Sequence, residues 1–203
     1  MNQTVFIVDD DDAIRDALTQ LLGTAHLHVE SYADGPAFLD AYGEERSGCL
    51  LLDMAMPEMT GLEVQAALRD RGLRIPVVFL TGHGDIPMAV RSLQAGAIDF
   101  LEKPVDEALL LERVRRALQL DEEWRREHKR GQAILQRHAR LSAREREVMA
   151  LAVSGLTSKE IAQKLGISPR TIEVHRTHVM HKMGAANLAE LVHMAAYCTS
   201  ATH

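Results

Sequence analysis

Five polar side chains in the first half of the chain stand at or just after the ends of short apolar runs. They are Asp9, Asp10, Asp53, Thr81 and Lys103. Clustered carboxylates repel one another and recruit a cation, and hard oxygen ligands suit Mg²⁺, for which Mn²⁺ could substitute. With Mg²⁺ and Lys103 neutralising a phosphoryl group, Asp53 could attack that group as a nucleophile. Thr81 could then donate a hydrogen bond to the new phosphoryl oxygens.

The apolar runs beside these side chains predict five β-strands. They are Val5–Val8, Leu27–Ser31, Cys49–Leu52, Val77–Leu80 and Ile98–Leu101. Three of them are almost wholly apolar, as expected when helices cover both faces of a parallel sheet. Amphipathic segments lie between them, so residues 1–120 should form a doubly wound α/β domain. The carboxyl ends of its strands share one edge, which brings the five polar side chains to one hollow.

Each polar residue, taken singly, also has a purely structural interpretation. One of Asp11 and Asp12 is expected to cap the first helix. A lone Asp at a strand end is usually a turn residue, and Lys103 before Pro104 could be a solvated loop lysine. Their joint occurrence at the ends of predicted strands favours a site.

These residues stand in motifs that resemble the receiver domain of two-component response regulators, over residues 4–120. The motifs are Val8-Asp9-Asp10-Asp11-Asp12, the stretch Leu50–Gly61, Leu80-Thr81-Gly82-His83-Gly84 and Phe100-Leu101-Glu102-Lys103-Pro104. The resemblance implies a (βα)5 fold with strand order 2-1-3-4-5, and Asp53 as the phosphoacceptor. It implies that Asp10 and Asp53 bind Mg²⁺ directly and Asp9 through water. It also implies that the Ala55 carbonyl is another ligand.

The resemblance also implies a switch and a backbone feature. Thr81 and Phe100 match the family's switch pair, in which the hydroxyl moves to the phosphoryl group and the aromatic ring swings inward. Many relatives have Tyr at the Phe100 position, and Phe keeps the packing but loses the hydroxyl. A cis peptide bond is expected before Pro104, which aims Lys103 at the site.

The segment 141–203 has helical periodicity throughout and predicts an all-α domain. Four short helices are expected at about 143–154, 158–165, 169–183 and 188–198. Three capping boxes mark their starts: Ser142 with Glu145, Thr157 with Glu160, and Asn187 with Glu190. The second and third helices, with Gly166 in the turn, have the layout of a helix-turn-helix. A plain four-helix bundle remains the alternative.

The motifs of this segment resemble the LuxR-type helix-turn-helix, and the whole chain resembles the FixJ branch of the NarL/FixJ response regulators. Carried onto this sequence, the base-reading positions are Glu173, Val174 and Thr177. The DNA-backbone contacts are Lys159, Ser168, Arg170, Thr171, Arg176 and Lys182. Glu173 replaces a lysine of some relatives, and an acid can accept a hydrogen bond from cytosine N4 but cannot bind guanine O6. The last helix is the family's dimer element, or it packs only within its own bundle.

The segment 121–140 is highly charged and is expected to be a partly helical linker, with a flexible tether as the alternative. Gly131 marks its expected break. Charge is uneven along the chain: residues 1–120 carry 20 acidic and 10 basic side chains, whereas residues 141–203 carry 5 and 7. An acidic N-terminal domain and a mildly basic C-terminal domain indicate different partners for the two domains.

Composition excludes several other classes of protein. The chain has 203 residues, 46% of them hydrophobic and 26% charged, which is ordinary globular composition. No apolar run is long enough to span a bilayer and no export signal is visible, so we expect a cytoplasmic protein without a membrane partner. Cys49 and Cys198 lie far apart and are expected to be free thiols.

The resemblance implies a sensor histidine kinase, double-stranded promoter DNA and RNA polymerase as partners, and a homodimer on phosphorylation. The chain would then be no enzyme beyond the phosphorylation and dephosphorylation of Asp53. A phosphatase with an aspartyl nucleophile is the enzymatic alternative, but that class needs a second Asp where this chain has Ala55. A regulator that binds DNA without phosphorylation is the other alternative.

Overall fold

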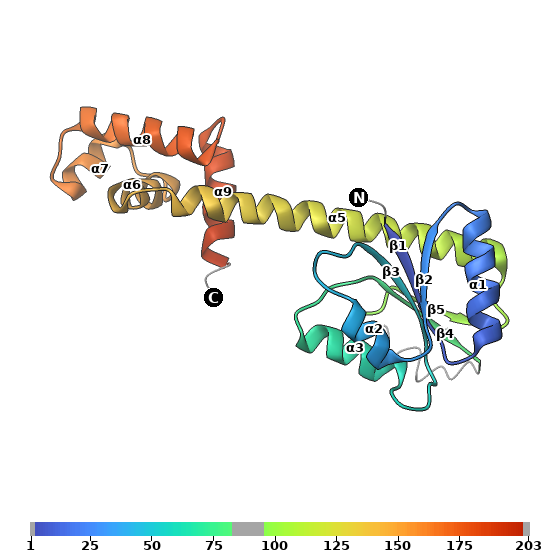
Figure 1. Cartoon of the computed structure of the whole chain (residues 1–203). Helices are drawn as coiled ribbons and strands as arrows, with labels where there is room; N and C mark the ends of the chain where they lie inside the picture. The colour runs from blue at the N-terminus through green and yellow to red at the C-terminus, as the bar shows by residue number, and fades with distance from the viewer. Residues whose placement is uncertain (1–2, 83–95, 201–203) are drawn as a thin grey trace. The chain divides into compact units, whose positions relative to one another are not determined.

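The computed structural model describes residues 3–82 and 96–200, and the chain divides into two compact units, Met1–Arg125 and Arg126–His203 (Figure 1). The two units are described one at a time. Among the described residues, no helix is long and apolar enough to cross a membrane. Cys49 and Cys198 are both buried and free.

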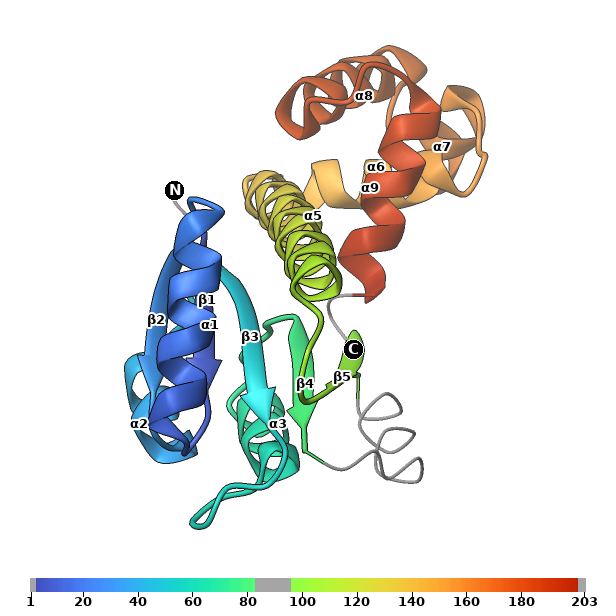
Figure 2. The same ribbon diagram turned by 90° about the vertical axis from the view of Figure 1, so that its right-hand side faces the viewer.

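The first unit is built on a five-stranded parallel sheet. Its strands are β1 (Thr4–Val8), β2 (His28–Tyr32), β3 (Gly48–Asp53), β4 (Val77–Thr81) and β5 (Asp99–Glu102). The strand order is β2-β1-β3-β4-β5, which can be followed across the sheet in Figure 2. All neighbouring strands run parallel. The predicted order 2-1-3-4-5 is confirmed.

Helices cover both faces of this sheet, as the apolar strands predict. The described helices are α1 (Asp12–Thr24), α2 (Gly35–Ala41), α3 (Gly61–Asp70) and the first part of α5 (Glu107–Ala139). Alternate residues of β1 point to opposite faces: Phe6 and Val8 pack in the core with α2 and α3, whereas Val5 and Ile7 pack in the core with α1 and α5. Figure 1 shows α2 and α3 on one side of the sheet and α1 on the other.

In the second unit, every secondary-structure element among the described residues is a helix. After the last part of α5 come α6 (Ala143–Val153), α7 (Ser158–Leu165), α8 (Pro169–Met183) and α9 (Leu188–Ser200). Gly166 ends α7 and Gly184 ends α8, both in the left-handed conformation that glycine adopts most readily. The four predicted helices agree with these bounds to within about two residues.

Helix α5 passes through Gly131 without interruption, so the expected break at this glycine is wrong. The reason lies in packing: a Cβ atom at residue 131 would come within 1.9 Å of the Tyr197 hydroxyl oxygen. Glycine lets the Tyr197 ring lie against the α5 backbone. The helical propensity lost at this position is offset by the helix-forming residues around it and by the contact with α9.

Side-chain caps fix most helix starts, largely as the sequence predicts. Asp11 caps α1 by accepting the Ala13 and Ile14 N–H groups. The capping boxes of α6 and α7 are both formed. The third box differs, because the Glu190 carboxylate accepts the N–H of Ala186 and not that of the cap residue. A further box, Thr60 with Glu63 at the start of α3, was not predicted.

Candidate functional site

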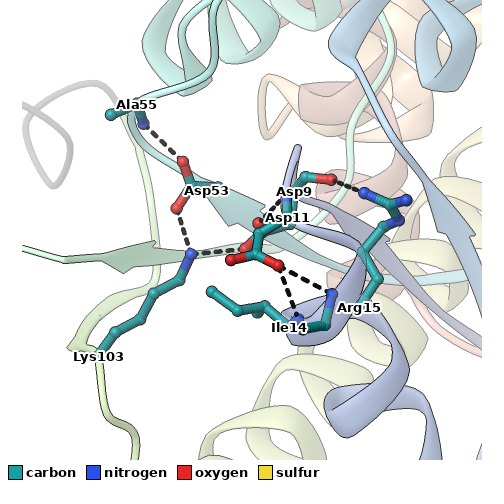
Figure 3. A network of polar contacts seen from close by, with 8 residues as sticks. Asp9, Asp11, Ile14, Arg15, Asp53, Ala55 and Lys103 are labelled. Carbon is teal, nitrogen blue, oxygen red and sulfur yellow. Dashed lines mark hydrogen bonds and ion pairs between the residues drawn. The ribbon is translucent and has the colours of Figure 1, made fainter.

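Two neighbouring strands bring two acidic side chains together at the carboxyl edge of the sheet. Asp9 directly follows β1, and Asp53 is the last residue of β3, which pairs with β1. Lys103 follows β5, and the peptide bond between Lys103 and Pro104 is cis, as the resemblance implied. Figure 3 shows the Lys103 ammonium between the two carboxylates.

The Lys103 ammonium binds both acids. Its Nζ lies 2.6 Å from Asp9 Oδ2 and 2.5 Å from Asp53 Oδ1. The second oxygen of each acid accepts a backbone N–H: Asp9 Oδ1 from Asp11 at 3.0 Å and Asp53 Oδ2 from Ala55 at 2.8 Å (Figure 3). Every carboxylate oxygen of the pair therefore has a partner, and the geometry of the pair is fixed.

Burial sets the electrostatics of this cluster. Asp9 is fully buried and Asp53 is 5% exposed. Burial raises the pKa of Asp9, although Lys103 opposes this shift. Burial would lower the pKa of Lys103, but its hydrogen bonds to Asp53 and Asp9 outweigh that effect and raise it. Two carboxylates and one ammonium leave a net negative charge, so the site favours a further cation.

The cluster fits Mg²⁺ by ligand chemistry, because Asp9 and Asp53 offer hard oxygens within reach of one cation. The Asp10 side chain is exposed and does not join them. Within the described part of the chain, no three His, Cys, Asp or Glu side chains lie close enough together to hold an ion. The Ala55 N–H donates to Asp53, so residue 55, whose carbonyl is a predicted ligand, lies next to the site.

The two predicted switch residues lie on adjacent strands. Thr81 is buried at the end of β4. Phe100 lies on β5 opposite Phe79 of β4. It is partly buried against the apolar core cluster that contains Phe79. A shift of Thr81 and Phe100 is expected to reshape the surface near residues 91–96 and 98–101. Residues 91–95 of this surface lie outside the described residues.

The second unit presents α8 as an exposed helix with one buried side. Ile172, Val179 and Met183 are buried, whereas Glu173, Val174 and Thr177 face solvent, and Val174 is 49% exposed. An exposed helical surface with an acid, an apolar group and a hydroxyl has the chemistry to contact base edges in a major groove.

Most of the predicted DNA-backbone contacts are exposed, with two qualifications. The exposed members are Lys159, Ser168, Arg170, Thr171 and Lys182. Arg176 is only partly exposed. The Lys182 ammonium lies 2.7 Å from the buried Glu145 carboxylate. Sequence reasoning identified Glu145 only as part of a capping box and missed this ion pair.

Two families match this chain. Residues 5–115 match the response regulator receiver domain, and residues 139–195 match the bacterial regulatory proteins of the luxR family. The chain therefore belongs to the two-component response regulators that combine a receiver domain with a LuxR-type DNA-binding domain. Receiver domains of this family generally bind Mg²⁺ at their acidic site.

Similar proteins span almost the whole chain. The transcriptional regulatory protein FixJ of Azorhizobium caulinodans is 46% identical over 191 residues, covering 94% of this chain and 90% of FixJ. The response regulator protein TodT of Pseudomonas putida is 40% identical, covering 93% of this chain and 83% of TodT. These relatives are named as regulators, which indicates a role other than that of an enzyme.

Two solved structures of response regulators are also similar to this chain over almost its whole length. The response regulator StyR is 43% identical with a TM-score of 0.86, covering 97% of this chain and 99% of its own. Full-length FixJ from B. japonicum is 40% identical with a TM-score of 0.59, covering 98% of both chains.

Proposed function

We propose that this chain is a cytoplasmic transcription factor controlled by phosphorylation of Asp53. A sensor histidine kinase donates the phosphoryl group, and the phosphorylated chain forms a homodimer. The dimer binds double-stranded promoter DNA and, with RNA polymerase, activates transcription. The observation that carries the proposal is the pair of buried carboxylates, Asp9 and Asp53, that share the Lys103 ammonium at the carboxyl edge of the sheet.

In this proposal Asp53 accepts the phosphoryl group. One of its carboxylate oxygens forms a bond to phosphorus while the phosphorus–nitrogen bond of the donor breaks, and the electron pair stays on the donor imidazole. Lys103, already in contact with Asp53, neutralises the charge that develops there. Mg²⁺ would be held by Asp53, the Ala55 carbonyl and, through water, Asp9, with Asp10 joining only if its exposed side chain turns inward, and it would supply further positive charge.

The new charge is read out by Thr81 and Phe100. A phosphoryl group adds about −1.5 to −2 charge at neutral pH. It biases the receiver only by bonding one arrangement better than another. Thr81 donates its hydroxyl to the phosphoryl oxygens, and the half-buried Phe100 moves inward. The surface of β5, with Ile98–Leu101, changes and favours dimerisation.

Dimerisation strengthens DNA binding, because two linked units hold two half-sites together more tightly than either alone. In each protomer of the dimer, Glu173, Val174 and Thr177 contact base edges. The DNA backbone is contacted by Lys159, Ser168, Arg170, Thr171 and Arg176, whereas Lys182, the remaining predicted contact, is bound to Glu145.

The test is treatment of the full chain with a small phosphodonor and Mg²⁺. We expect one acid-stable mass adduct, an increase in size, and tighter binding to a duplex selected from a random-sequence pool. Asp53→Asn should lose all three responses, whereas Asp70→Asn, at an exposed aspartate, should keep them. Equal size and equal DNA affinity with and without the donor would refute phosphorylation control.

A further inference from the structure

Glu145 is a buried acid in the second unit, and it binds a base on another helix. Only 4% of its surface is exposed. Its Oε2 accepts the Ser142 N–H and the Lys182 ammonium, each at 2.7 Å. Its Oε1 lies 3.9 Å from His178 Nδ1. The Lys182 ammonium and the Ser142 N–H lower the pKa of Glu145 to about 2.

These contacts join the start of α6 to the last turn of α8. Lys182 and His178 lie on α8, four residues apart, and both face Glu145. The same end of α8 is held a second time, because Arg137 of α5 donates from Nη1 to the Met183 carbonyl at 3.1 Å. Positive charge near the carboxyl end of a helix also stabilises the helix dipole. The last turn of α8 is thus fixed by two charge-assisted bonds from two different helices.

We infer that Glu145 is a positioning residue for α8, and that it acts through Lys182. On this assignment the Lys182 ammonium holds the helix in place and is not a DNA-phosphate contact. The inference rests on the proposed DNA-binding function of α8 and corrects one of the DNA contacts that the sequence predicts.

Electrostatics favour this division of work. If Lys182 turned to a phosphate, the Glu145 carboxylate would lose its strongest partner, and the loss of such a charge-assisted hydrogen bond is costly. Arg170 sits in the first turn of α8, is exposed, and reaches a phosphate at no such cost. The two basic residues of α8 therefore have different roles: Lys182 holds the helix in place, and Arg170 is available to contact DNA.

The dependence of DNA affinity on salt separates the two roles. Loss of one phosphate contact lowers the slope of log affinity against log salt by about one. We expect this for Arg170→Gln in the full chain on a mixed-sequence duplex. Lys182→Gln should keep the slope of the unmodified chain, yet weaken binding to a duplex selected from a random pool by about tenfold, because a displaced α8 loses base contacts.

Hydrogen exchange of the α8 amides in the DNA-free chain gives a readout independent of binding. Glu145→Gln and Lys182→Gln should both speed exchange in the last turns of α8, whereas Lys182→Arg, which keeps the charge, should restore protection. Arg170→Gln should leave exchange there unchanged.

Unchanged protection in Lys182→Gln, together with a slope lowered by about one, would overturn the inference. If the unmodified chain selects no duplex, the proposed DNA-binding function fails. In that case the exchange rates alone decide whether Glu145 positions α8 through Lys182.

Discussion

Asp121 Oδ2 accepts the backbone N–H of Gly48 at 2.9 Å in the interior of the first unit. Gly48 begins β3, the strand that ends at Asp53, and Asp121 belongs to α5. Arg125, one turn further along α5, donates to both oxygens of Asp121 at 3.0 Å and from Nη1 to the Glu44 carbonyl at 3.2 Å. Residues 121–125 are thus bound to the amino end of the central strand.

Asp121→Ala should destabilise the first unit by about 2–4 kcal/mol, because it leaves a buried N–H without an acceptor and Arg125 without its acid. Denaturant unfolding of the full chain measures this change. Glu123→Ala, at an exposed acid of the same helix, is the control and should change stability by about 0.5 kcal/mol or less. Similar effects of the two substitutions would show that the contact contributes little.

Gly131 and Tyr197 should show strong energetic coupling. Gly131→Ala alone gains about 1 kcal/mol of helix propensity but forces the Tyr197 hydroxyl away, so its net effect should be unfavourable. In a Tyr197→Ala background the same change should stabilise the chain by about 1 kcal/mol. A double-mutant cycle on unfolding free energies measures the difference. Equal effects in the two backgrounds would contradict the close contact.

Lys103→Met should destabilise the first unit more at neutral than at acidic pH, when measured in a chelator. The substitution leaves Asp9 and Asp53 without their shared cation. Burial already raises the pKa of Asp9 above 3.8, so the folded state binds this proton more readily than the unfolded state. The resulting penalty grows as pH rises through the folded pKa and is relieved below it. Denaturant unfolding at several pH values tests this, and a loss independent of pH would count against it.

The loss of stability caused by Glu145→Gln should be largest above about pH 4.5. The folded pKa of Glu145 is about 2, below its ordinary value of 4.5, because Lys182 and Ser142 favour the carboxylate. The stability that this acid contributes is complete above its unfolded pKa and is lost as pH falls toward 2. The stability gap between the two chains should therefore close over this range. Acid unfolding curves that stay parallel would argue that other groups dominate.

Glu173→Lys should change base preference and not merely affinity. Glu173 is exposed on α8, and its carboxylate can only accept hydrogen bonds, which favours cytosine, whereas lysine donates to guanine. Selection from a random-sequence pool by both chains should show a cytosine-to-guanine exchange at one position of each half-site. Identical selected sequences would remove Glu173 from the base-reading set.

The sequence predicted the fold well, because its signals are local. Apolar runs such as Leu50–Leu52 mark buried strands, and Ser142 or Thr157 with an acid three residues later marks a helix start. The convergence of Asp9, Asp53 and Lys103 also followed, since parallel strands end at one edge. That prediction needed topology alone.

What the sequence did not predict depends on contacts between distant segments. From the sequence alone, Gly131 indicates a helix break. In the structure, the glycine leaves space for the ring of Tyr197, which lies 66 positions later in the chain. Asp121 and Glu145 stand among many surface acids, and nothing local distinguishes them as buried. Exposure of Asp10 is likewise set by how the loop after β1 turns.

The last part of α5 has a practical consequence for any attempt to excise the C-terminal half. Ile134 lies in the apolar core of that half, and Arg137 holds the end of α8. A fragment starting at residue 141, where the helix-turn-helix motifs begin, would lose Ile134 and Arg137. It would also lose the α5 backbone at Gly131, against which the Tyr197 ring lies. A fragment starting near residue 126 keeps them, so the shorter piece should be the more readily digested by proteases.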